Sequence, residues 1–208
     1  MQIDDKLTID LWGDYLSEDG TLDLSSFDIE TFKTFKFARN NCIKRGIWPQ
    51  GIDTIPEEMF SECSSLEEVA IPNTVNKVGE KAFYGCNRLR NVTFERRQTG
   101  NLFIGDDCFT YCYALEKVTI PEKASLDRKV FEDSSLEKII IETEDESVNF
   151  EYRHFGDLPA YTDSYEEDLE GTLKIYVKNE AMKEKIKNDF EEHVKPENII
   201  VGLPNEDE

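Results

Sequence analysis

The residues most able to take part in catalysis or metal binding are five cysteines and two histidines. Cysteine thiolates act as nucleophiles or metal ligands, and a histidine acts as a general base. Cys108 and Cys112 have the close spacing of half a zinc site, but no second such pair follows. His154 and His193 stand in no catalytic motif. We therefore predict that the chain is not an enzyme and holds no metal or other cofactor.

Acidic side chains are the other candidates, because 45 Asp and Glu against 24 Lys and Arg give a net charge of −21. This charge repels phosphates and argues against direct binding of nucleic acid or an anionic membrane. Residues 143–208 hold 19 acids and 7 bases, which is −12 of the total. One cluster among them is Glu166, Glu167 and Asp168, which lacks the spacing of an EF-hand. The acidic stretch from Glu144 to Glu170 is interpreted either as a solvated loop or as a docking surface for a basic partner.

A repeat positions three of the cysteines. Phe60, Phe83 and Phe109 each stand three residues before a Cys, and a Leu and then a Val follow at further intervals of three. Five such units, 21 to 26 residues apart, occupy residues 32–142. A unit of this size cannot bury its apolar side alone, whereas stacked units can. The pattern predicts a solenoid in which the repeated cysteines form a buried, structural column.

Each unit ends in alternating apolar and polar residues, as at Val69, Ala70 and Ile71. This alternation is typical of a short strand with one buried face. The segments Val78-Gly-Glu-Lys-Ala-Phe83-Tyr-Gly-Cys86 and Ile104-Gly-Asp-Asp-Cys-Phe109-Thr-Tyr-Cys112 resemble the BspA-like leucine-rich-repeat class. The resemblance implies an α/β repeat fold, a leucine-rich-repeat solenoid with one short parallel strand per coil.

The flanking segments are predicted to close the solenoid. Leu7, Ile9 and Leu11 alternate, and so do Leu22 and Leu24, which favours an N-terminal hairpin. After a last strand in Gly171–Val177, Asn179 is a helix cap and Ile199–Val201 a final strand. We therefore divide the chain into four parts. They are an N-terminal cap (1–31), five leucine-rich repeats (32–142), an acidic insertion or loop (143–170), and a C-terminal capping strand, helix and acidic tail (171–208).

The outward side of the strands holds the candidate binding residues. Aligned units place Lys117, Lys138 and Lys174 at one repeated position, so we expect a lysine ladder with neighbours about 4.8 Å apart. Either the acidic stretch neutralises this ladder, or the ladder binds an acidic or peptide partner with Ile140 and Tyr176 as apolar anchors. The candidate residues on this face are Arg45, Ile47, Lys117, Thr119, Lys138, Ile140, Lys174 and Tyr176.

The sequence favours a non-enzymatic module that binds another protein through the strand face or the acidic flank. The alternative is an acidic inhibitor that mimics nucleic acid or blocks a basic groove of a nucleic-acid-handling enzyme. A hydrolase in the 143–170 insertion has support only from the two histidines. No signal peptide or membrane-spanning segment is predicted, so we expect a cytoplasmic protein. The oligomeric state stays open.

Overall fold

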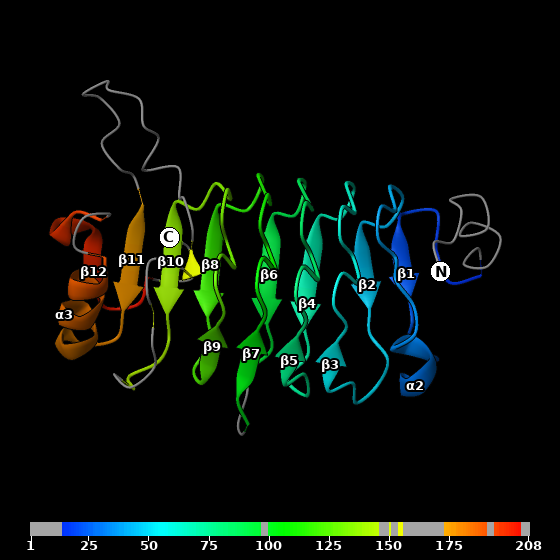
Figure 1. Cartoon of the computed structure of the whole chain (residues 1–208), viewed down its shortest axis with the longest axis horizontal. Coiled ribbons are helices and arrows are strands. Elements are labelled where there is room, and N and C mark those ends of the chain that lie inside the picture. The colour runs from blue at the N-terminus through cyan, green and yellow to red at the C-terminus, as the bar shows by residue number, and fades with distance from the viewer. Residues whose placement is uncertain are drawn as a thin grey trace.

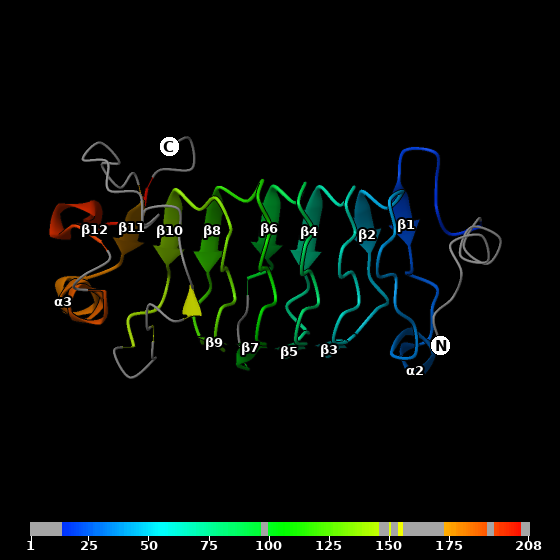
Figure 2. The same ribbon diagram turned by 45° about the horizontal axis from the view of Figure 1, so that its top comes forward.

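The computed structural model describes residues 14–96, 100–145, 150, 154–155, 173–190 and 194–204. Parallel strands stand side by side along the long axis of the molecule, as Figure 1 shows, and helix α3 lies at one end. The predicted architecture, a solenoid of short parallel strands, is confirmed. The turned view in Figure 2 separates the strands into a larger row and a smaller row.

The larger row is built from one strand of each coil. Its strands form three consecutive groups with parallel hydrogen-bonded ladders, β1-β2, β4-β6 and β8-β10-β11-β12. The strands are β1 (Thr21–Asp23), β2 (Arg45–Ile47), β4 (Glu68–Ile71), β6 (Asn91–Phe94), β8 (Lys117–Ile120), β10 (Lys138–Ile141), β11 (Lys174–Val177) and β12 (Ile199–Val201). We call the outward surface of these strands the strand face.

A second row of strands was not predicted. Four coils carry an additional strand of two or three residues, so the expectation of one strand per coil is too low. These strands pair in parallel in the order β3-β5-β7-β9. They are β3 (Thr54–Ile55), β5 (Lys77–Val78), β7 (Leu102–Ile104) and β9 (Ala124–Leu126). The coil is therefore flattened between two parallel sheets, with its apolar side chains between them.

A column of phenylalanine rings fills the space between the sheets. Phe60, Phe83 and Phe109 stack with centroids 5.7 and 5.3 Å apart and planes within 2° of parallel. The column extends to Phe37 at one end and through Phe131 to Phe155 at the other. Stacked aromatic pairs add stability beyond the area they bury. The repeated Phe therefore fixes the position of each coil relative to its neighbour.

Besides the two sheets, backbone hydrogen bonds beside these rings form a third connection between neighbouring coils. The N–H of Phe60 donates to the carbonyl of Ala82 at 2.8 Å, and Phe83 donates to Cys108 at 3.0 Å. Residues two positions to either side of the Phe adopt positive φ, among them Glu58, Glu62 and Lys81. This conformation turns alternate N–H groups toward the next coil, and the coil-to-coil hydrogen bonds stabilise it against its strain.

The N-terminal end of the larger row is closed by an antiparallel segment. Leu16 forms a bridge with Leu22, and the N–H of Asp23 donates to the carbonyl of Tyr15 at 2.8 Å. Helix α2 (Ile29–Phe32) follows, capped by Asp28. The predicted hairpin included Leu7, Ile9 and Leu11, which lie outside the described residues. Leu22 instead belongs to β1, a parallel coil strand paired with β2.

The C-terminal end follows the prediction. Asn179 caps α3 (Glu180–Asp189), since its side-chain oxygen accepts from the N–H of Met182 at 2.8 Å. Met182, Ile186 and Phe190 are buried and cover the end of the core, with the Phe190 ring 5.5 Å from that of Phe155. The short helix η2 (Pro196–Asn198) leads into β12, which pairs in parallel with β11.

The range predicted to be an acidic insertion contains part of a further coil. Phe150 and Phe155 are fully buried, and Phe155 continues the phenylalanine column beyond Phe131. They stand five residues apart, as Ile55 and Phe60 do. Leu173 is also buried and leads into β11. In the sequence, residues 156–172 therefore stand between the Phe and the Leu of this coil.

Candidate functional site

The strand face carries two rows of side chains that run along the long axis. Alternation along each strand turns every second residue outward, so each strand of the larger row from β2 to β11 contributes one residue to each row, and β12 contributes Ile200 to the second. The first row comprises Arg45, Glu68, Asn91, Lys117, Lys138 and Lys174. The second row comprises Ile47, Ala70, Thr93, Thr119, Ile140, Tyr176 and Ile200. The ladder registers place these residues opposite one another within each hydrogen-bonded group, as the sequence alignment of the units predicted.

At the N-terminal part of the face, opposite charges meet. The Arg45 guanidinium lies 3.1 Å from a carboxylate oxygen of Glu68, and both side chains are about half exposed. Such an exposed pair contributes little to stability. Ile47 beside it is 45% exposed, as an apolar contact residue requires. The charges of this Arg45–Glu68 pair cancel.

At the C-terminal part of the face, like charges meet. Lys138 lies directly opposite Lys117 on one side and Lys174 on the other. Among the described residues, no acid lies within ion-pair distance of Lys117 or Lys174. The Lys138 ammonium lies 5.5 Å from the centre of the Tyr176 ring, a cation–π contact. The expected lysine ladder is therefore present in the backbone register.

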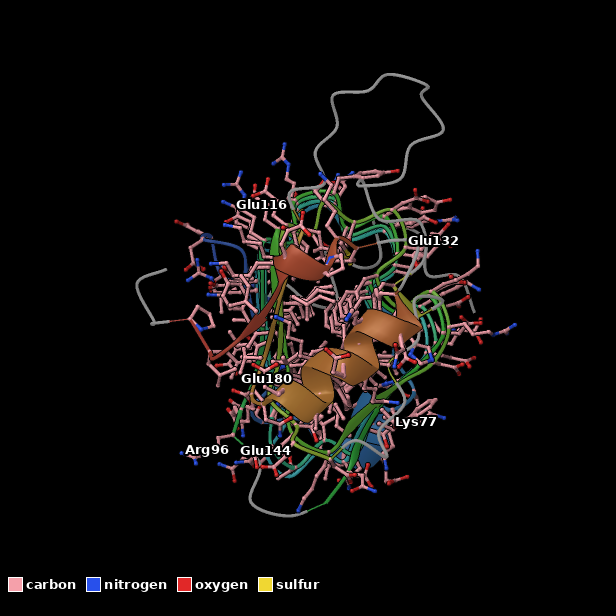
Figure 3. All side chains as sticks on the ribbon, turned by 90° about the vertical axis from the view of Figure 1, so that its left-hand side faces the viewer. Lys77, Arg96, Glu116, Glu132, Glu144 and Glu180 are labelled. Atoms are coloured by element: carbon pink, nitrogen blue, oxygen red, sulfur yellow. The ribbon has the colours of Figure 1, made fainter. Side chains whose placement is uncertain are left out.

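Acidic side chains border the ladder at both ends of the strands. Figure 3, which looks along the solenoid, places Glu116 at one end of the strand face and Glu144 at the other. Glu144 lies 4.0 Å from Lys178 rather than against the ladder. Glu166, Glu167 and Asp168 lie outside the described residues, so their proposed role stays a prediction. The positive charge is thus confined to a stripe in the middle of the face.

Ile140 is less accessible than the sequence indicated. It lies on the outward row, yet only 7% of it is exposed, and it is not part of the interior core cluster. The expectation that it projects as an apolar anchor is wrong. Thr119 and Tyr176, its neighbours on β8 and β11, are half-buried. On β8, β10 and β11 the second row is therefore uncharged and half-buried or buried, whereas Ile47 on β2 is exposed.

The sequence analysis did not include Ile200 in this face. The register pairs Tyr176 with Ile200, which extends the uncharged row to the last strand. The signal was present, because Ile199–Val201 was predicted to form a strand. Phe190 stands ten residues before Ile200, as Phe60 does before Ala70, but positions 193 and 196 hold neither the Cys nor the Leu of the repeat, so the strand was not aligned with the repeat units.

The cysteines have a structural role inside the coils. The Cys63 thiol donates to the carbonyl of Phe37, and the Cys86 thiol to that of Phe60, both at 3.1 Å. Cys112 makes the same bond to Phe83 at 3.4 Å. Each repeated thiol thus satisfies a buried carbonyl of the preceding coil, a role for which a small, weakly polar donor is suited. The column is buried, as predicted.

Burial also makes these thiols unreactive. It raises the pKa of Cys63 to about 12 and raises the pKa values of Cys86, Cys108 and Cys112 as well. Because the thiolate is the nucleophile, these groups are poor reagents at neutral pH. Within the described residues, no three His, Cys, Asp or Glu side chains are grouped as metal ligands. His154 is buried, and His193 lies outside the described residues.

The helices of the described part of the chain are too short or too polar to cross a membrane.

A family model of a repeat region agrees with this geometry. Residues 30–156 match the family model described as BspA type leucine-rich repeat region, in six copies. This range is more than half of the chain. A crystal structure of a leucine-rich repeat protein from Bacteroides capillosus ATCC 29799 is similar over 62% of this chain and 91% of its own, at 23% identity and a TM-score of 0.41. No curated protein matches the chain.

Proposed function

The chain belongs to the BspA-type leucine-rich-repeat family, and on that premise we propose that it is a non-enzymatic module that binds another protein through its strand face. Repeat solenoids present one extended surface to which every coil contributes, and such surfaces serve recognition. Here that surface is the strand face, whose two outward rows run from β2 to β11.

One observation carries the proposal, namely the lysine ladder. Like charges on directly opposite residues destabilise a sheet. Lys117 and Lys174 nevertheless flank Lys138 in a protein of net charge −21, and no described acid pairs with either of them. The chain has 45 acidic against 24 basic side chains, yet these three consecutive outward positions hold only lysines. The ladder is therefore best explained by a partner that supplies negative charge.

The test is affinity capture with matched charge reversals. The bait is the whole chain in three forms, namely wild type, Lys117→Glu/Lys174→Glu, and Lys77→Glu. Lys77 is the matched control, because it is an exposed strand lysine of the smaller row and lies on the opposite side of the molecule (Figure 3). We expect a protein that the wild type and the Lys77→Glu variant retain at least about tenfold better than the double variant.

Two outcomes contradict the proposal. One is that every captured protein is retained equally by all three baits, since the ladder then takes no part in binding. The other is a basic nucleic-acid-handling protein that ignores the ladder substitutions and dissociates at high salt. That result identifies the acidic C-terminal part as the binding surface and favours nucleic-acid mimicry.

A further inference from the structure

The spacing of the two outward rows specifies the kind of segment that fits them. Resting on the proposed function, we propose that the partner covers the ladder with an acidic amphipathic α-helix that crosses β8, β10, β11 and β12 along the long axis of the solenoid. The carboxylates of the helix face Lys117 and Lys174, and its adjoining apolar side chains face Thr119, Tyr176 and Ile200 in the second row.

The repeat distances favour a helix. Neighbouring strands are about 4.8 Å apart, an α-helix advances about 5.4 Å per turn, and an extended chain advances about 6.8 Å between side chains on one face. Lys117 and Lys174 are two ladder steps apart. Over two steps a helix drifts out of register by about 1.2 Å, and an extended chain drifts by about 4 Å. Flexible lysine side chains absorb the first mismatch but not the second.

The width of the site also matches a helix. The two rows on a strand are two residues apart, which is about 6.8 Å, and a helix with its side chains is about 10–12 Å across. A helix lying on the face therefore contacts both rows at once. The uncharged second row, continuous from Thr119 to Ile200 in the ladder, calls for an apolar column beside the acidic one.

The borders of the stripe exclude a uniformly acidic segment. Glu116 and Glu137 stand at the start of β8 and β10, and both are exposed. Glu142 and Glu144 follow the end of β10. A chain that is acidic on all sides places some of its carboxylates against these glutamates and is repelled. The acids of the partner must therefore lie in one narrow column, as an amphipathic helix arranges them.

The first part of the test uses three fluorescent synthetic peptides of about 18 residues, which is long enough to cross four strands as a helix. The first places Glu at i, i+4, i+7 and i+11 with Leu in the neighbouring column. The second has the same composition in an order that scatters the Glu around the helix. The third is the first with two central residues replaced by Pro. We expect the first to bind the whole chain at least about tenfold more tightly than the others, measured by fluorescence anisotropy.

The second part locates the bound helix. Lys117→Glu/Lys174→Glu is expected to weaken binding of the first peptide at least about tenfold, while Lys77→Glu changes it by less than about twofold. Thermal unfolding of each variant shows that the fold is retained. Equal binding of the three peptides overturns the inference, and so does equal loss in the two variants. Tight binding of the Pro-containing peptide alone assigns the site to an extended segment and also overturns it.

The two proposals fail separately. A captured protein that depends on Lys117 and Lys174, combined with peptides that bind alike, leaves the interaction function standing and removes the helical partner. If no protein depends on the ladder, the proposed function fails, whatever the peptides do.

Discussion

The interior of the coils and the strand face follow different rules. Inside, the same Phe recurs from coil to coil, and the rings from Phe37 to Phe155 stack 5.3–5.8 Å apart. On the strand face, the same position changes from Arg45 and Glu68 to a run of lysines. Neighbouring coils contact each other at both places, yet only the interior is uniform.

The difference shows which physical requirement determines the residue types in the interior and on the strand face. A buried side chain must fit the same residue in the coils on both sides, so one change forces others, because interiors are close-packed. An outward side chain meets only its ladder neighbours and solvent. Residue choice there is free to serve solubility or recognition. The lysine ladder is not explained by a requirement for solubility, so it is informative about recognition.

The largest expected effect is a break in the interior column. Phe83→Ala removes a ring stacked on both sides, at 5.7 Å from Phe60 and 5.3 Å from Phe109. We expect it to lower the free energy of unfolding by about 3–5 kcal/mol in urea titrations. The control is Phe103→Ala, because Phe103 is 37% exposed on β7, and we expect it to cost less than about 1 kcal/mol. Equal losses would contradict the contrast between interior and surface.

A smaller effect is expected where two coils approach backbone to backbone. A Cβ on Gly79 would lie 2.5 Å from the amide nitrogen of Glu57 and 2.7 Å from its Cα. Gly79→Ala therefore forces the coils apart, at a cost of about 1–3 kcal/mol. Gly46→Ala on β2 is the matched control, because its Cβ meets nothing within 4 Å. We expect the control to be neutral or slightly stabilising in the same titrations, and a loss as large as that of Gly79→Ala would refute this reading.

The thiol column gives the interior a pH dependence. Burial raises the pKa of Cys86 well above its ordinary value. The unfolded chain therefore releases this proton first, near pH 8.5, and the free energy of unfolding falls as the pH rises further. The loss is about 1.4 kcal/mol per pH unit for each such thiol, until the pH reaches the pKa of the folded state.

Cys86→Ser isolates this contribution. Between pH 9 and 10, its unfolding free energy should fall less steeply than that of the wild type, by about 1.4 kcal/mol per pH unit. Cys86→Ala is the control, because it also lacks the thiol but cannot donate to Phe60. It should share the slope of Cys86→Ser at a lower absolute stability. Slopes identical to that of the wild type would show that Cys86 ionises alike in the folded and unfolded chain.

Much of the interior was predictable, because stacking makes the pattern repeat. The Phe and Cys positions and the alternating strands around Val69 and Val118 recur at nearly constant spacing, and α3 has a clear cap at Asn179. The smaller row was missed because strands such as Thr54–Ile55 are too short to show alternation. Phe155 was missed because its Leu stands 18 residues later, instead of the six that separate Phe60 from Leu66.

The candidate site was predictable only in its register. Aligning the units places Lys117, Lys138 and Lys174 on one line, and the ladders agree. The pairing of Arg45 with Glu68 and the burial of Ile140 depend on how side chains of adjacent coils lie across one another. Nothing in one unit determines that arrangement, so the local pattern carries no signal for it.

The smallest expected effect sharpens the contrast most directly. Lys117→Thr removes one like-charge neighbour of Lys138 and introduces a residue that suits strands. Lys77→Thr makes the same change on β5, where the ladder neighbours are Thr54 and Phe103. The difference between the two variants isolates the repulsion, and we expect Lys117→Thr to be more stable than Lys77→Thr by a few tenths of a kcal/mol, about 0.2–0.5. A deficit of that size instead would show that the ladder supports the fold. A gain, together with lost partner binding, would mean that Lys117 is kept at a small cost to stability, which is the pattern expected of a recognition residue.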